Sequence, residues 1–285
     1  MKKSITLVLA MLSLGAYAQP KPATQAMIVT KTTIVSPESE DAASPVNTST
    51  TTADGAEVRM VRFSGDGETK TTTWLKNDLV KTFSESEMGR TTVIRDNSKK
   101  ATTTIMEMMG KKTGIYATDE EQAEMSRRMD SMMKSRGQNV SFGGRTASAP
   151  AYSIIYIDEN KKIAGYACKK AFVIGKRTDR TDTTTVWYCP DFKLQNLPST
   201  GGIGAGFGGF NAITGPTGME LLNGFPMQYE RNMPRGRHMT VEVTKLVIDK
   251  DIADKEFEIP KDIEVKNAKD MQNGVGPMIQ IRAGG

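Results

Sequence analysis

A pattern of apolar, β-branched and polar residues typical of strands dominates Gln25–Met109 of this 285-residue chain. Runs rich in Thr, Val and Ile are separated by turn-forming clusters such as Ser64–Gly67, Lys76–Asp78 and Arg95–Asn97. These runs are typical of antiparallel β-strands, because β-branched side chains pack well on a half-buried sheet. The pattern predicts strands at Met27–Val35, Glu57–Phe63, Thr69–Leu75, Leu79–Ser84, Thr91–Ile94 and Thr102–Met109.

The stretch after Thr118 has the residue spacing of an amphipathic helix instead of a strand. Thr118 and Glu121 have the spacing of a capping box, and Gly137 is suited to end a helix. Four methionines at i, i+4, i+7 and i+8 form one apolar stripe on this predicted helix: Met125, Met129, Met132 and Met133. The first interpretation is packing against the sheet, since any helix needs a buried face. The alternative is a compliant wall for acyl chains, because thioethers adapt to irregular shapes.

Strands resume after residue 150, with a turn predicted at Asp158–Lys161. The predicted strands of this half are Tyr152–Ile157, Ile163–Gly175, Thr181–Cys189, Phe225–Glu230 and His238–Val247. Residues 36–54, 137–150 and 198–218 are rich in turn-forming residues and are predicted loops, and residues 261–285 are a predicted flexible tail. The chain is therefore expected to be mainly β (α+β), with one domain over residues 19–260.

The N-terminus has the layout of a cleavable secretory signal at residues 1–18. Two lysines precede an apolar run at Ile5–Leu14, and a small-x-small sequence ends at Ala18, so cleavage is expected between Ala18 and Gln19. The mature chain is expected to be exported and to be periplasmic or associated with the outer membrane. Because Gln19 is not a cysteine, it is not expected to be a lipoprotein. No later apolar run is long enough to span a bilayer, so no transmembrane segment is expected after cleavage.

The two cysteines of the chain lie on a predicted hairpin. If the hairpin turns near Thr178 and Asp179, residues whose numbers sum to 357 face each other, and Cys168 lies opposite Cys189. Export favours a disulfide between them, because disulfides persist in oxidising compartments. The alternative is a pair of free buried thiols that act as small apolar side chains. The same register places Trp187 opposite Lys170.

Charge and motifs exclude several functions. Removal of the signal leaves 36 basic residues against 33 acidic ones, too small an excess to indicate nucleic-acid binding. The Gly204–Gly209 stretch matches G-x-G-x-x-G but lacks the strand and helix of a nucleotide site. His238 is the only histidine, and Asp249, Asp251 and Asp254 lack the pattern of a calcium loop. No cofactor, metal site or catalytic residue is predicted, and the protein is not expected to be an enzyme.

Four short motifs in order resemble a known family: Lys161–Lys170, Val186–Tyr188, Gly224–Met227 and Phe257–Pro260. The chain resembles, over Tyr152–Lys266, an exported bacterial domain-of-unknown-function family of the 4412 type. That family is similar in fold to the outer-membrane lipoprotein carriers. The resemblance implies a curved antiparallel sheet that forms an incomplete barrel, covered by one or more helices around an apolar cavity.

Two functions from different classes follow from this expectation. The first is a non-catalytic envelope protein that binds or carries a lipid or other apolar ligand. Its cavity would be lined by Trp74, Met125, Met129, Met132, Met133, Phe172 and Trp187. The second is an envelope structural or protein-interaction module with no small ligand. An unfilled apolar cavity would support the first, and a packed core with an exposed apolar patch would support the second. A hydrolase ranks third.

Overall fold

The fold was analysed in a computed structural model of the whole chain. The structure describes residues 20–37, 47–51, 57–61, 67–86, 89–108, 110–135, 151–176, 181–194, 218–233 and 236–270. The predicted loops 137–150 and 198–217 and the signal segment 1–18 lie outside these residues. So does most of the predicted 36–54 loop.

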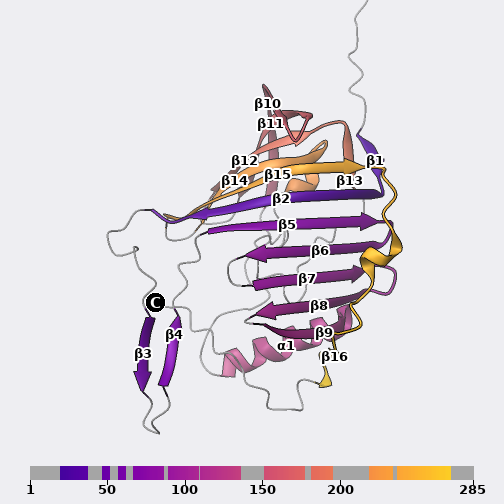
Figure 1. Cartoon of the computed structure of the whole chain (residues 1–285). Helices are drawn as coiled ribbons and strands as arrows, with labels where there is room; N and C mark the ends of the chain where they lie inside the picture. Colours follow the sequence, from indigo (N-terminus) through magenta and orange to yellow (C-terminus); the bar gives the residue numbers. More distant parts are fainter. Residues whose placement is uncertain are drawn as a thin grey trace, which may run out of the picture.

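Strands make up most of the described chain, with one α-helix among them (Figure 1). The strands before the helix are β1 (Lys21–Ala23), β2 (Gln25–Val35), β3 (Asn47–Thr51), β4 (Glu57–Val61), β5 (Gly67–Lys76), β6 (Leu79–Ser86), β7 (Gly89–Asp96), β8 (Ala101–Met108) and β9 (Lys111–Thr118). The helix α1 (Asp119–Ser135) is followed by β10 (Ala151–Ile163), β11 (Tyr166–Lys176), β12 (Thr181–Cys189), β13 (Phe192–Leu194), β14 (Phe225–Asn232), β15 (His238–Ile248) and β16 (Val265–Asn267). Two short 3-10 helices are η1 (Met219–Leu221) and η3 (Asp254–Phe257).

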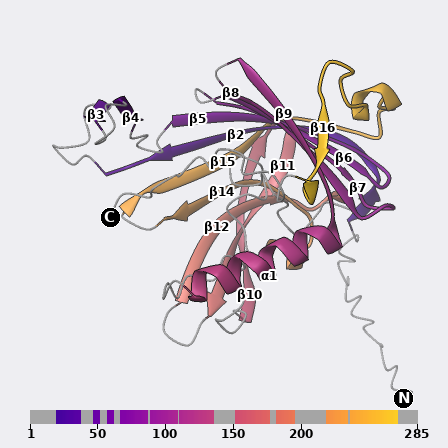
Figure 2. The ribbon, with the colours of Figure 1, turned by 90° about the horizontal axis from the view of Figure 1, so that it is seen from below.

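A single 12-stranded sheet forms the body, in the order β10-β11-β12-β14-β15-β2-β5-β6-β7-β8-β9-β16. Its strands are antiparallel except for β16, which runs parallel to β9. The sheet curves without closing into a barrel, and α1 lies beside its open side (Figure 2). Strands β10 and β16 lie at opposite ends of the sheet (Figure 1). The expected fold class, a mainly β protein with a curved, open antiparallel sheet and a helix, is confirmed.

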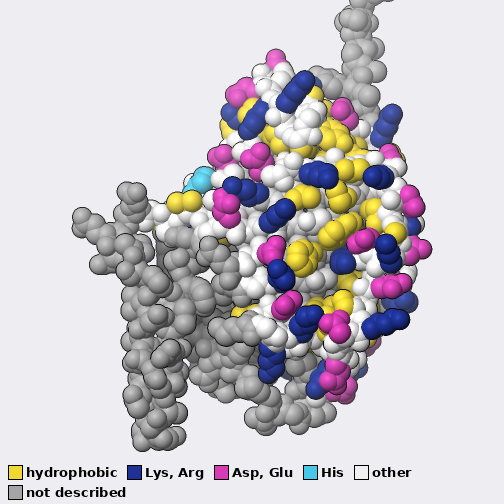
Figure 3. Space-filling model, in the orientation of Figure 1, with side chains coloured by type: hydrophobic (Ala, Val, Ile, Leu, Met, Phe, Trp, Pro, Cys, Tyr) yellow, Lys and Arg dark blue, Asp and Glu magenta, His cyan; other side chains and the backbone are white. Residues whose placement is uncertain are grey.

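Strand register divides the side chains into two faces, because successive residues of a strand point to opposite sides. The inner face contains a cross-strand row that is mostly buried: Ile28, Thr73, Thr82, Val93 and Thr104. The adjacent residues form a row on the outer face: Met27, Trp74, Lys81 and Ile94. Figure 3 shows hydrophobic side chains along the middle of this outer face, with charged side chains around them.

The buried apolar residues form two clusters. One lies under the short parallel pair β1–β13 and includes Leu75, Ile28, Phe192, Cys168 and Cys189. The other lies against β11, β12, β14 and β15 and is covered by Leu222, which is 0% exposed. Burial of such aliphatic and aromatic side chains supplies the main favourable free energy of folding.

The predicted turn at Asp158–Lys161 is wrong, because β10 continues through it. Asn160 pairs with Lys169 across a bulge, and the chain turns instead at Ala164 and Gly165. Both of these residues have positive φ, 49° and 86°, as a tight two-residue hairpin requires. The bulge lets the polar residues Asp158–Lys161 remain within the strand. Their polar composition is typical of a turn, which is why the sequence predicted one there.

The first part of the predicted flexible tail is also ordered. Val265, Lys266 and Asn267 form β16 on the edge of β9, and Ala268 is 4% exposed. The preceding segment is held by Lys76, whose Nζ donates to the Ile252 carbonyl and to Asp254, each at 2.7 Å. Residues 271–285 lie outside the described part of the chain.

Substitution of Gly224 tests the tight approach between β14 and β12. A Cβ atom at Gly224 would lie 2.1 Å from the Cys189 carbonyl oxygen, and the residue has φ +153°. We expect Gly224→Ala to lower the free energy of unfolding by about 2 kcal/mol more than Gly67→Ala, because overpacking adds to backbone strain. Gly67 is a matched control, since it has φ +132° but no atom within 4 Å of its added Cβ. Equal losses in urea denaturation would contradict this account.

Candidate functional site

Hydroxyl side chains follow one another across four strands on the inner face. Strand register pairs Thr30 with Thr71, Thr71 with Ser84, and Ser84 with Thr91. We call Thr30, Thr71, Ser84 and Thr91 the hydroxyl row. A hydroxyl can both donate and accept a hydrogen bond, so this row is a continuous polar feature of the inner face.

The hydroxyl row is packed. Thr30, Thr71 and Ser84 are 3%, 1% and 5% exposed. Thr71 Oγ1 and Ser84 Oγ lie 3.1 Å apart and share a hydrogen bond. Beside them, the hydroxyls of Thr73 and Thr82 lie 3.4 Å apart. Pairing offsets much of the cost of burying these groups, so they can belong to a core.

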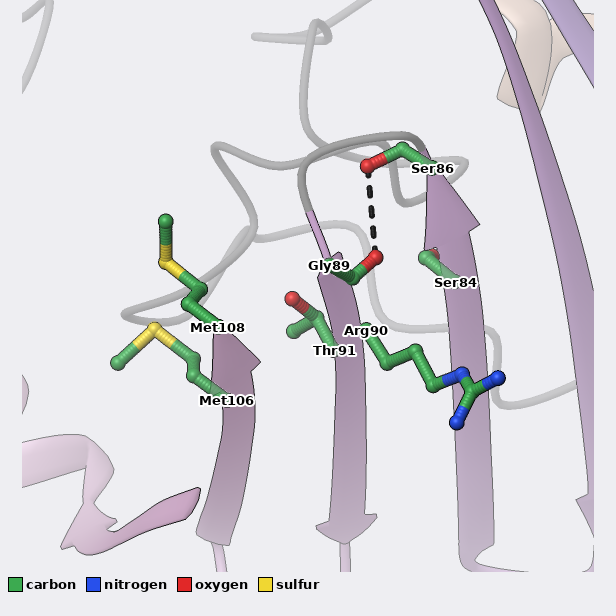
Figure 4. A pocket seen from close by; sticks show the side chains of 7 residues that line it. All are labelled: Ser84, Ser86, Gly89, Arg90, Thr91, Met106 and Met108. Atoms are coloured by element: carbon green, nitrogen blue, oxygen red, sulfur yellow. Dashed lines mark hydrogen bonds between the residues drawn. The ribbon is translucent and has the colours of Figure 1, made fainter. Parts of the chain in front are cut away.

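A shallow hollow lies at one end of the hydroxyl row, where β6 and β8 end and β7 begins (Figure 4). Its lining residues are Ser84, Ser86, Gly89, Arg90, Thr91, Met106 and Met108. It takes in about 330 Å³ including the open space at its mouth, so the part enclosed by protein is smaller. Ser86 Oγ donates to the Gly89 carbonyl at 3.4 Å, and Met108 is 37% exposed. The hollow is therefore small and partly apolar.

The start of α1 is fixed to the inner side of the sheet. Arg95 Nη2 donates to Asp119 Oδ2 at 2.8 Å, and the guanidinium makes a second contact with the other carboxylate oxygen. The predicted capping box is confirmed. The Thr118 amide donates to Glu121 Oε2 at 2.8 Å, and the Glu121 amide donates to Thr118 Oγ1 at 3.3 Å. Arg95 holds the pKa of Asp119 below its usual range through this hydrogen bond.

The aromatic residues predicted to line an apolar cavity do not lie on the inner face. Trp74 lies on the outer face with Lys81 Nζ 5.3 Å from its ring. Trp187 lies on that face between two lysines, and Phe172 contacts one of them, Lys170. Period-two alternation explains the difference, because the residues beside Trp74 occupy the inner face.

The methionines of α1 remain a prediction as a cavity wall. Met125 is half-buried, whereas the side chains of Met129, Met132 and Met133 lie outside the described part of the chain.

The cysteine hairpin has the predicted register. Lys169 pairs with Tyr188 and Lys170 with Trp187, so the next residues in line are Cys168 and Cys189. Both are free thiols in this structure and are 1% and 0% exposed. Burial raises the pKa of each thiol to about 11, so both stay protonated near neutral pH and are poor nucleophiles. The disulfide stays a prediction.

The single histidine of the sequence lies at the start of β15. His238 Nδ1 lies 3.1 Å from Asn232 Oδ1 at the exposed end of β15. No group of three or more His, Cys, Asp or Glu that could hold a metal ion occurs among the described residues. Within the same ranges, no helix has the length and apolar character needed to cross a membrane.

Comparison with known proteins gives distant likenesses. No family model and no curated protein matches the sequence. Among solved structures, the chain is similar to PNGF-II at 14% identity and TM-score 0.36, over 88% of this chain and 33% of that one. The chain thus spans about a third of the length of PNGF-II.

Two further solved structures are matched. The Pseudomonas aeruginosa MucA/MucB complex is matched at 10% identity and TM-score 0.34, over 83% of this chain and 56% of that one. A putative outer membrane lipoprotein-sorting protein domain from Vibrio parahaemolyticus is matched at 8% identity and TM-score 0.23. The match covers 82% of this chain and 88% of that one. TM-scores this low carry no argument about function, and membership of the 4412-type family is not confirmed.

The cysteine pair yields a redox prediction. We expect Cys168 and Cys189 to be joined in protein collected after export, because they follow the paired residues Lys169 and Tyr188 and the expected compartment is oxidising. Mass spectrometry of protein denatured in an alkylating reagent without reductant should find neither cysteine modified. Reduction before alkylation is the control and should modify both. Modification of both without reduction would contradict the disulfide.

The ion pair between Arg95 and Asp119 at the start of α1 predicts how stability depends on pH. The folded pKa of Asp119 is lowered, so its stabilisation is present above the unfolded value near 3.9 and lost as pH falls through the folded value. Asp119 is 49% exposed, so solvent screens the pair with Arg95. We expect Asp119→Asn to cost about 0.5 kcal/mol at pH 7, measured by denaturant titration, and almost nothing at pH 2. A deficit that persists at pH 2 would show a different cause.

Proposed function

We propose that this chain is an exported, non-catalytic protein of the bacterial envelope that acts as a protein-interaction module. The observation that carries the proposal is the packed inner face of the sheet. Thr71, Thr104 and Leu75 are 1%, 2% and 0% exposed. A carrier of acyl chains needs an unfilled apolar space in that position.

The polarity of the inner face also argues against an acyl ligand. An acyl chain cannot hydrogen-bond to the hydroxyl row, so contact with it leaves hydroxyl groups without a partner. The Thr71–Ser84 hydrogen bond satisfies these groups within the protein instead. The inner face is therefore better suited to hold the curved sheet together than to receive a lipid.

Three apolar side chains are exposed singly: Val35 of β2, Leu221 of η1 and Ile259 after η3 are 56%, 52% and 40% exposed. Single exposed apolar residues are ordinary on a protein surface, so the proposal does not depend on them. The export expected from residues 1–18 and the near balance of charges agree with a partner in the envelope rather than a nucleic acid.

A lipid or other apolar ligand is the second candidate, because methionines surround the hollow. Met106 and Met108 line it, and Met108 is 37% exposed. Thioether side chains adapt to varied apolar shapes. Such a ligand would use the hollow, which shares Ser84 and Thr91 with the hydroxyl row, and would leave the buried Thr30 and Thr71 untouched.

Lipid analysis distinguishes the two candidates. Protein purified after export is examined by native mass spectrometry, and an organic extract is analysed for acyl species. We expect the mass of the bare mature chain and no acyl species near one per chain. An acyl species near one per chain would overturn the proposal in favour of the carrier.

Two variants locate any ligand that is found. Met106→Asp places a charge in the hollow, and Met27→Asp places one on the half-buried outer face. Loss of the acyl species only in Met106→Asp would assign it to the hollow. Equal loss in both would indicate a general effect on folding, which circular dichroism of each variant would reveal.

A further inference from the structure

Strand β10 forms one end of the large sheet, so one of its two edges has no neighbouring strand among the described residues. Residues Ala151–Ile157 of this strand read Ala-Tyr-Ser-Ile-Ile-Tyr-Ile, with no charge, no glycine and no proline. Ile155 and Tyr156 are 48% and 44% exposed. An uncharged edge with these residues is a ready site for pairing with another strand.

The two ends of the sheet differ in protection. At the other end, β16 is three residues long and includes Lys266, which limits pairing. In β10 the bulge and the charged residues begin only at Asp158, beyond the uncharged stretch. Seven consecutive residues of β10 therefore carry no charge, proline or bulge, which are the devices within a strand that keep an edge from pairing.

We propose that β10 pairs with β10 of a second copy of this chain, antiparallel and centred on Ile154. In this register Tyr152 of each copy faces Tyr156 of the other, and Ser153 faces Ile155. Ile154 faces its own equivalent on the two-fold axis. Aromatic pairs and aliphatic pairs directly opposite each other stabilise antiparallel strands.

The sequence of the edge favours a second copy over an unrelated peptide. Its inner-face residues are Tyr152, Ile154 and Tyr156, an order that reads the same in both directions. A two-fold axis requires this self-complementarity, since the same patch contacts itself. No like charges face each other within the paired stretch.

Both limits of the paired stretch are set by the chain itself. Pro150 directly precedes β10 and has no N–H to donate, so pairing ends there. The bulge after Ile157 interrupts the ladder at the other limit. Tyr156 is held in place, because its ring lies 5.5 Å from that of Tyr188 and its hydroxyl accepts from the Asn223 amide at 3.1 Å.

Sedimentation velocity of the mature chain tests the association. At 50–100 μM, on the order of the concentrations where weak dimers form, we expect twice the monomer mass. Ile155→Lys places two lysines beside the axis and should raise the dissociation constant at least about tenfold. Val35→Lys, at a position that is 56% exposed on β2, is the control and should leave the dimer intact. A monomeric wild-type chain, or a dimer unchanged by Ile155→Lys, would overturn the proposal.

A cross-link tests the register without depending on the stability of Ile155→Lys. Air oxidation with copper phenanthroline should join Ile154→Cys into a covalent dimer, because residue 154 faces its equivalent. Ile157→Cys is the control and should join poorly, because residue 157 faces Ala151 of the other copy. The buried native cysteines are common to both variants. Equal cross-linking of the two variants, or none in Ile154→Cys, would contradict the register. Neither result depends on whether the protein binds a lipid or a partner.

Discussion

Strand pairing in register is the constraint on which the other features of this molecule depend. Twelve strands are joined edge to edge, so the pairing of one strand determines which residues of the next face inward. A shift of one residue in β5 would exchange Thr73 with Trp74 and bring an indole into the inner face. Bulges in β10, β14 and β15 add residues locally without losing the pairing on either side. The curvature, the clusters and the exposed edge all follow from this ladder.

Much of this ladder could be predicted from the sequence where local signals are strong. The hairpin of Cys168 and Cys189 has the predicted register, and the capping box of α1 forms as expected. The residues of β9 and β16 were missed, because Lys111, Lys112 and Lys266 give them little apolar alternation. Those strands form through pairing with neighbours distant in sequence, which local propensity does not encode.

The candidate site was harder to predict than the fold, because alternation identifies two sets of residues but not which set is inside. Trp74 and Trp187 are large and apolar, so they were expected to line the cavity. The inner positions of β5 instead hold Thr71 and Thr73, and both are buried. Threonine combines a β-branched shape with a hydroxyl, so its abundance indicated strands and concealed the hydroxyl row. Finding the row requires the cross-strand pairs, which depend on the complete topology.

The short parallel strand β16 has a consequence for how large an assembly can become. It covers the edge of β9 with a segment of the same chain, tied to the body through Lys76 and the Ile252 carbonyl. One end of the sheet is thus occupied in advance by the chain's own C-terminal segment. Within the large sheet of the described residues, growth by strand addition is then favoured at the β10 end, and the first addition covers that edge. Such a chain forms a finite pair, whereas a sheet with two open ends would elongate into a fibre.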